Sequence, residues 1–277
     1  MMSTVPASEA STALIRGTSG DIGGRSFEQM AWSSVGIIAL LMFWQIGATT
    51  GVLPVQYTSS PDLVIRAAAR MIADGSLIRD LMVTLTEFTI GMAAAIAIGI
   101  PLGLVTGWYK RVQYALDPYL AALYATPSLA LLPLLVLWFG IGIKSNVVLV
   151  IISAFFPIVM NVVQGVNTVD ANLVRMARSF GSGQMRIFRE IVLPATVPFI
   201  ASGLQLGVAR GLIAVIVGEM FASNGGLGYL ITVTGSAMAI DQMFVAVTII
   251  TALGIILLGA TRSFERRMQY WKPKATQ

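Results

Sequence analysis

Long apolar runs constrain this chain more than any other feature of its sequence. A helix needs roughly 20 predominantly apolar residues to cross the hydrocarbon core of a membrane. Hydrophobic residues make up 56% of the chain and charged residues only 11%, whereas about a quarter of a soluble domain is charged. We therefore expect an all-α membrane protein, in which the excess of basic residues requires no nucleic-acid partner. Six runs are expected to be transmembrane helices: 32–50, 81–107, 116–139, 146–164, 195–221 and 242–261. Pro127 and Pro133 are expected to kink the third of them.

One long polar interval, residues 168–194, interrupts this apolar pattern. It contains four arginines and two acids. Apolar residues recur at helical spacing from Val169 to Phe180, after a candidate N-cap at Thr168 or Asp170. A Gly-Ser-Gly segment beginning at Gly181 then ends that helix, and a second short helix precedes Pro194. The interval is thus predicted to form a helix-turn-helix between two membrane spans.

The remaining polar segments divide the chain into a membrane domain and two tails. Residues 1–30 are rich in Ser, Thr and Gly and lack the apolar core of a signal peptide, so they are expected to form a flexible N-terminal tail. The six-helix domain is expected at 31–262 and a basic C-terminal tail at 263–277. Residues 51–80 include an amphipathic helix, which is expected to lie on the membrane surface.

The distribution of basic residues predicts the orientation, because cytoplasmic loops carry an excess of Lys and Arg. With the N-terminus inside, thirteen of the 18 basic residues fall in cytoplasmic segments and four outside; Arg210 falls within a span. The expected topology is therefore N-in/C-in, with residues 168–194 in the cytoplasm. The thirteen are Arg16, Arg25, Lys110, Arg111, Arg175, Arg178, Arg186, Arg189, Arg262, Arg266, Arg267, Lys272 and Lys274, and the four are Arg66, Arg70, Arg79 and Lys144.

The polar interval resembles the EAA loop of bacterial ATP-binding-cassette (ABC) import permeases. The resemblance rests on Ala177, on Gly181 and on the Ile191-Val-Leu193-Pro194 segment. Arg175 stands where that family has Glu, and Met176 where Ala is usual. Further motifs resemble the nitrate/sulfonate/taurine-type subfamily over roughly residues 80 to 270: Gly99-Ile-Pro-Leu-Gly103, Leu137-Trp-Phe-Gly-Ile-Gly142, Phe155-Phe-Pro-Ile158, Gly226-Leu-Gly-Tyr-Leu230 and Glu265-Arg-Arg267.

The resemblance implies a type I ABC importer permease fold and a multi-pass position in the bacterial inner membrane. It implies that the loop grips a cytoplasmic ATPase through Asp170, Arg175, Ala177, Gly181, Ile191, Leu193 and Pro194. It also implies a homodimer, two ATPase copies and an extracytoplasmic solute-binding protein that delivers a small anionic solute such as nitrate, a sulfonate, taurine or a carboxylate. ATP would then be bound by the partner, and this chain would need no cofactor.

The residues agree that the chain is not itself an enzyme. It contains no Cys and no His, which removes thiol nucleophiles, Cys/His metal sites and His general bases. The phosphate-binding pattern Gly-x-x-x-x-Gly-Lys-Ser/Thr does not occur. The alternatives are a secondary transporter or channel for a small anion, which leaves the long polar loop without a role, and an intramembrane enzyme, for which the chain offers no acid pair at helical spacing.

Three ionisable residues fall within the expected spans, where a charge is costly unless it faces a partner or a cavity. Glu87 and Glu219 are near the outer ends of their spans, and each is either solvated at the interface or functional. Arg210 is deeper, about 22 Å along its helix from Ala195. It either forms a structural ion pair, with Glu87 as a candidate, or presents a cation to an anion pathway. All three are candidates for the translocation pathway.

Glycine spacing predicts which helices pack closely. One ladder contains Gly99, Gly103 and Gly107, and another contains Gly203, Gly207 and Gly211. Small residues at every fourth position let helix backbones approach. Tight packing without a transport role is the simplest interpretation of both ladders.

Overall fold

A computed structural model describes residues 22–269 of the chain, and all of the regular structure in that range is helical. The chain divides into two compact units, residues 1–63 and 64–277. The described part of the smaller unit contains α2 (Ile22–Thr49) and α3 (Val55–Thr58), and α4 begins at its end. The indole N–H of Trp44 donates a hydrogen bond to the carbonyl of Thr58 over 3.1 Å, which ties α3 back to α2.

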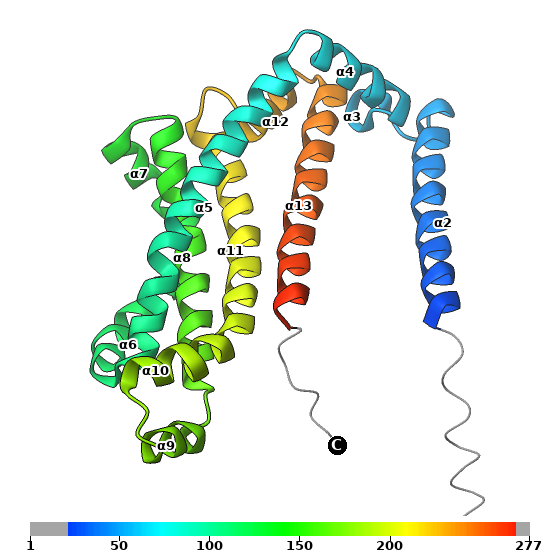
Figure 1. Ribbon diagram of the computed structural model, residues 1–277. Helices are drawn as coiled ribbons and strands as arrows, with labels where there is room; N and C mark the ends of the chain where they lie inside the picture. The colour runs from blue at the N-terminus through cyan, green and yellow to red at the C-terminus, as the bar shows by residue number, and fades with distance from the viewer. Residues whose placement is uncertain (1–21, 270–277) are drawn as a thin grey trace, which may run out of the picture. The chain divides into compact units, whose positions relative to one another are not determined.

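The larger unit is built around α8, which packs along both α5 and α11 (Figure 1). Helix α13 packs against α11 and α12. Helix α12 lies at one end of this bundle and α9 at the other. The elements are α4 (Pro61–Ala73), α5 (Ser76–Trp108), α6 (Lys110–Ala125), the 3₁₀ turn η1 (Ser128–Leu131), α7 (Leu132–Phe139), α8 (Ile143–Asn167), α9 (Ala171–Ser179), α10 (Gln184–Ile187), the π-helical turn η2 (Phe188–Val192), α11 (Leu193–Ala222), α12 (Leu227–Ser236) and α13 (Ile240–Gln269).

Helix α8 packs closely against both glycine ladders, and close helix packing is what their spacing predicts. A methyl group added at Gly103 or Gly107 would come within 2.7 or 2.6 Å of the Cβ atom of Val162 or Val166, respectively. On the other side of α8, a methyl group at Gly207 would approach Ile158 to 3.1 Å. The ladders therefore let α5 and α11 approach α8 within one chain, which confirms the packing interpretation.

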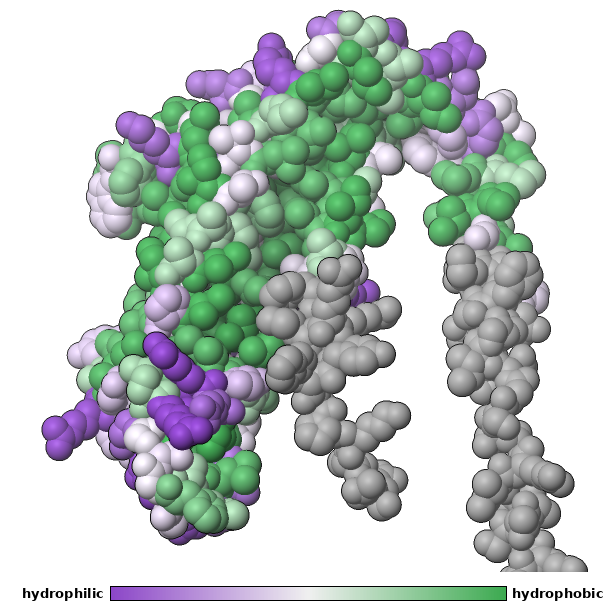
Figure 2. Space-filling view, in the orientation of Figure 1, coloured by the Kyte–Doolittle hydropathy of each residue, from purple (hydrophilic) through white to green (hydrophobic). Residues whose placement is uncertain are grey.

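The sides of the bundle are apolar and its two ends are polar, as Figure 2 shows for one face. Four helical segments are long and apolar enough to cross a membrane: Ser76–Trp108, Ile143–Asn167, Gln184–Ala222 and Ile240–Ser263. A fifth is obtained if the bent pair Lys110–Ala125 and Ser128–Phe139 counts as one span. In the smaller unit, the described apolar segment Ser34–Thr49 is shorter than a span. Within the described residues the structure thus supports four or five spans, and the count of six stays a prediction.

The third expected span is broken, which corrects the single kinked helix predicted over residues 116–139. Its two halves meet at an angle of 83°. Thr126, at the C-cap of α6, has an extended backbone, which is the conformation favoured before a proline. Pro127 then caps η1, and Pro133 lies in the first turn of α7. Two prolines that begin new helices explain why the chain turns here.

The expected tails are shorter than the sequence suggested. Residues 22–30 belong to α2, and residues 263–269 continue α13. The rest of both tails lies outside the described residues. Between them, the predicted amphipathic helix is present as α4, which buries Ala67 and Met71. After α4, the amide and hydroxyl of Ser76 bind the exposed Asp74 carboxylate and lower its pKa.

Candidate functional site

The interval 168–194 folds as a helix-turn-helix at one end of the bundle (Figure 1). The Asp170 carboxylate accepts the amide of Asn172 at 2.7 Å and caps α9. At the other end, Gly181 has φ +79°, and the amide of Ser182 donates to the carbonyl of Ala177 at 3.0 Å. This left-handed glycine cap satisfies the last carbonyls of the helix. The predicted cap and the predicted turn are both confirmed.

Helix α9 buries none of its own residues. Its apolar side chains are exposed instead: Leu173 by 52%, Met176 by 56% and Phe180, just after the helix, by 84%. An exposed cluster of large apolar side chains on a short charged helix marks an interaction surface. We call Leu173, Met176 and Phe180 the α9 apolar face.

The segment that leads from the loop back into the bundle, α10 and η2, is anchored by buried side chains. Ile187 and Val192 are each about 1% exposed, and the ring of Phe188 packs edge-on against Trp108 with centroids 5.5 Å apart. The motif residues Ile191 and Leu193 are partly buried beside them, and Pro194 is exposed at the start of α11.

The loop arginines form only local contacts in the structure. Arg175 donates to the side-chain oxygen of Asn172 one turn earlier at 2.5 Å. Arg186 pairs with Glu190 at 3.0 Å, and both side chains are more than 60% exposed. Arg175, Arg186 and Glu190 are therefore all available at the surface.

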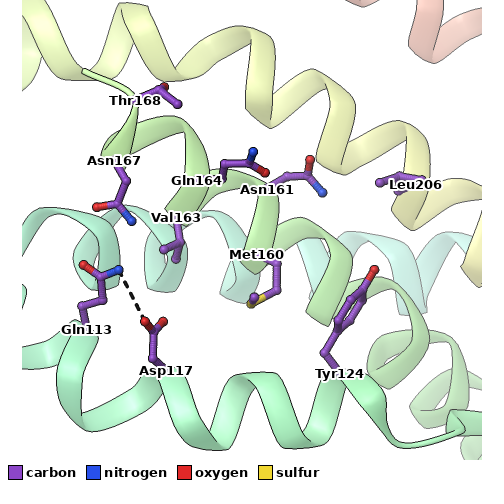
Figure 3. Close-up of a pocket in the computed structure, with 10 residues that line it drawn as sticks. All are labelled: Gln113, Asp117, Tyr124, Met160, Asn161, Val163, Gln164, Asn167, Thr168 and Leu206. Carbon is purple, nitrogen blue, oxygen red and sulfur yellow. Dashed lines mark hydrogen bonds between the residues drawn. The ribbon is translucent and has the colours of Figure 1, made fainter. Parts of the chain in front are cut away.

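A polar cavity of about 620 Å³ opens between α6, α8 and α11. Figure 3 shows its amide side chains: Asn161, Gln164 and Asn167 come from α8, and Gln113 comes from α6. The remaining lining residues are Asp117, Tyr124, Met160, Val163, Thr168 and Leu206. The cavity thus offers hydrogen-bond donors and acceptors inside a bundle whose sides are otherwise apolar.

Two basic side chains reach the edges of this cavity. Lys110 donates to Gln113 and to Asn167, each at 3.0 Å. The guanidinium carbon of Arg210 lies 5.8 Å from the ring centroid of Tyr124, a cation–π distance. Arg210 is exposed. The ion pair with Glu87 is not formed, and Glu87 instead accepts a hydrogen bond from Asn146.

Residues 99–270 match the family model described as "binding-protein-dependent transport system inner membrane component". This match covers more than half of the chain. The chain belongs to this family. It is a multi-pass membrane permease of the ABC transporter type, and subunits of this type are not themselves enzymes.

Sequence relatives of the permease include three transport proteins. It is 30% identical to the taurine transport system permease protein TauC of Escherichia coli, over 86% of this chain and 89% of TauC. It is 28% identical to the putative aliphatic sulfonates transport permease protein SsuC of Bacillus subtilis, over 84% of each chain. It is 30% identical to the formylaminopyrimidine transport permease protein ThiX of Halalkalibacterium halodurans, over 86% of this chain and 94% of ThiX.

Solved structures share the fold of the permease. The inward-facing MetNI methionine ABC transporter aligns with a TM-score of 0.61 at 18% identity, covering 69% of this chain and 95% of that chain. At this identity the similarity concerns the fold alone.

The sequence predicted Glu87 and Glu219 near the outer ends of their membrane spans. In the structure, both side chains are fully buried in the protein. Sequence reasoning also missed three polar residues around them: Asp80, Thr84 and Asn146, which are at most 3% exposed. The available signal was the spacing of Asp80, Thr84 and Glu87, which places them on one face of α5.

Proposed function

We propose that this chain is the membrane subunit of an ATP-driven importer, and that the segment α9–α10 is the socket for a cytoplasmic ATPase. The observation that carries the proposal is the α9 apolar face, because no described element of the chain covers it. A partner that buries Phe180 would gain roughly 1.5–3 kcal/mol from that side chain alone. The neighbouring Arg175 and the motif residues Ala177, Ile191, Leu193 and Pro194 would then shape the socket around this anchor.

The orientation follows from the same proposal. With α9 in the cytoplasm, the end that carries α12 faces outward, which is where a solute-binding protein would dock. The topology is then N-in/C-in. Because the chain has no cysteine, single replacements can be labelled in intact cells without background. Ser236→Cys should react with an impermeant thiol reagent from outside, and Ser182→Cys should react only after the membrane is opened; the reverse pattern would refute this orientation.

We further infer that two copies of the permease assemble with two ATPase subunits, and that the polar cavity is part of the solute pathway. A second copy of the chain could close the open side of the cavity, and Arg210 lies at its edge over Tyr124. Relatives are named for taurine, aliphatic sulfonates and formylaminopyrimidine. A small anionic solute of the sulfonate class suits the first two of these names and the exposed guanidinium, which can donate two parallel hydrogen bonds to such a group.

Co-purification tests the socket directly. Phe180→Ala should weaken the affinity of the permease for the ATPase at least about tenfold, since 1.4 kcal/mol corresponds to a factor of ten. Less ATPase should therefore co-purify with the variant. Ser179→Ala is the matched control, because this neighbouring position is also exposed but has no large apolar surface to lose. Full ATPase binding and normal uptake by Phe180→Ala would show that the α9 apolar face is not the socket.

A further inference from the structure

A buried polar cluster joins α5, α8 and α11 to the start of α12, and the transport function proposed above makes no use of it. Glu87 on α5 and Glu219 on α11 are both 0% exposed. The amide nitrogen of Asn146, on α8, donates to Glu87 Oε1 at 3.2 Å. Three helices of the bundle thus direct polar groups toward one point in its interior.

The N-terminus of α12 is held by this cluster. The first amides of a helix have no partner within the helix. Here three successive amides are bound by side chains of other helices: Gly226 N–H by Asp80 Oδ1 at 3.3 Å, Leu227 N–H by Thr84 Oγ1 at 2.9 Å, and Gly228 N–H by Glu219 Oε2 at 2.7 Å. The positive end of the helix dipole therefore faces the acids.

The two glycines around Leu227 make this approach possible. A methyl group at Gly226 would collide with the carboxyl group of Glu219, and one at Gly228 would collide with the backbone carbonyl of Ile216. The backbone of α12 and the side chain of Glu219 are therefore in contact with no room for a side chain between them. This explains the Gly-Leu-Gly segment in physical terms.

The charges around Glu87 and Glu219 do not balance if both are ionised. The other acidic side chains of the cluster that holds Glu219 are Glu87 and Asp80. Asn146 on α8 and the α12 amides are neutral. The nearest described base, Arg79, is 75% exposed and lies 3.7 Å from Asp80. Two adjacent buried carboxylates without a cation would cost several kcal/mol each.

The hydrogen bonds do not balance either. With both acids ionised, Glu87 Oε2 and Glu219 Oε1 have no donor within the described structure. Thr84 and Glu219 bind the adjacent amides of Leu227 and Gly228, which brings the Glu219 carboxyl group to the face of α5 that carries Glu87. A single proton between the two carboxyls would supply the missing donor and remove one negative charge.

We propose that Glu87 and Glu219 together bind one proton, and that this acid pair latches the N-terminus of α12 onto α5 and α11. The remaining negative charge is shared between the pair and the amides of α12. Removing the proton leaves two like charges in contact, which pushes the Glu219 carboxylate away from Glu87 and weakens its hold on Gly228. Because the folded pair holds a proton that a solvated glutamate gives up, the latch is present at low pH and is lost as the pH rises.

Infrared spectroscopy on the full-length permease in lipid nanodiscs tests for the proton. The wild type should show the carbonyl stretch of a buried protonated carboxylic acid, and Glu87→Gln should lose that band. Glu190→Gln, at an exposed carboxylate, is the control and should leave the band unchanged. A wild type without the band, or a band that survives in both Glu87→Gln and Glu219→Gln, would overturn the proposal.

Cysteine accessibility tests the latch. Thr234 on α12 is 4% exposed, so Thr234→Cys should be labelled only when α12 leaves the bundle. Labelling is expressed relative to that of the exposed Ser236→Cys at the same pH, so that ionisation of the thiol cancels. This ratio should increase at least about tenfold between mildly acidic and mildly alkaline buffer in the otherwise wild-type chain. The rise should vanish when Glu87→Gln is added, because the amide is a permanent hydrogen-bond donor. Labelling that is independent of pH would refute the latch. Labelling that changes with added Na⁺ or K⁺ at constant pH would show that the acids bind a metal cation instead of a proton.

Discussion

The two ends of the helical bundle differ in which side chains they bury and which they expose. At the α9 end, charged pairs such as Arg186–Glu190 are solvated and the large apolar side chains are exposed. At the α12 end, the acids Glu87 and Glu219 are fully buried and the helix start is satisfied by side chains of the same chain. The α9 end needs a partner to bury its apolar side chains. At the α12 end the chain supplies its own hydrogen-bond partners, apart from one missing donor between the two acids. Substitutions at the two ends should therefore fail in different assays.

The largest effect is expected at Gly228, where the α12 end has no free space. Gly228→Ala places a methyl group against the Ile216 carbonyl, so the backbone must move, and overpacking of this kind costs about 1–3 kcal/mol. Thermal unfolding in detergent should show a clear fall in Tm. Gly235→Ala, later in α12, is the control, because its methyl group would meet only Met243 Sδ at an ordinary 3.5 Å. Equal Tm values for the two variants would mean that the close contact at Gly228 is absent.

The next effect concerns the α9 end and should appear in assembly and not in Tm. Gly181 and Gly183 both have open space around their Cα atoms, but only Gly181 has a positive φ. Gly181→Val therefore introduces strain of roughly 1–2 kcal/mol, whereas Gly183→Val does not. We expect Gly181→Val to lower ATPase co-purification and uptake while the membrane domain stays folded. If both variants bind ATPase equally, the turn geometry does not determine docking.

A third prediction addresses Arg210, which belongs to neither end. Since Glu87 has other partners, loss of the guanidinium leaves no buried carboxylate unpaired, and Arg210→Gln should assemble normally. Uptake of a sulfonate should fall strongly in Arg210→Gln and partly in Arg210→Lys, because an ammonium lacks the planar fork of donors. Normal uptake by Arg210→Gln would remove Arg210 from the pathway.

The smallest effect is expected for the exposed pair Arg186–Glu190. A solvated pair at i, i+4 contributes about 0.3–0.5 kcal/mol, so Arg186→Ala should leave Tm nearly unchanged. A double-mutant cycle with Glu190→Ala measures the pairing energy. A coupling as large as that of a buried pair would contradict the contrast between the two ends.

The sequence predicted the elements of this fold better than their contacts. Apolar runs located α5, α8, α11 and α13, and turn chemistry located Asp170 and Gly181, because these signals are local. The break at Pro127 was expected as a kink, since a proline inside an apolar run does not reveal whether the next helix continues in the same direction.

The candidate site was less predictable for a physical reason. Helical spacing shows that Asp80, Thr84 and Glu87 share a face of α5, but it does not show which helix meets that face. The position of Glu219 opposite Glu87 depends on the register between α5 and α11, which both glycine ladders set through α8. A single charge at a known depth, such as Arg210, is equally compatible with an internal ion pair and with an exposed position.

Helix α11 is continuous with η2 and α10, so that residues Gln184–Ala222 form one helical segment of 39 residues. At about 1.5 Å per residue such a segment is about 58 Å long, roughly twice the thickness of the hydrocarbon core. The loop helix α10 lies at one end of this segment and Glu219 near the other, and the segment changes direction between α10 and α11 (Figure 1). The π-helical turn η2 is the point where the hydrogen-bond pattern of the segment changes. One continuous run of backbone hydrogen bonds therefore joins the α9–α10 loop to the buried acid pair, with η2 as its single irregular turn.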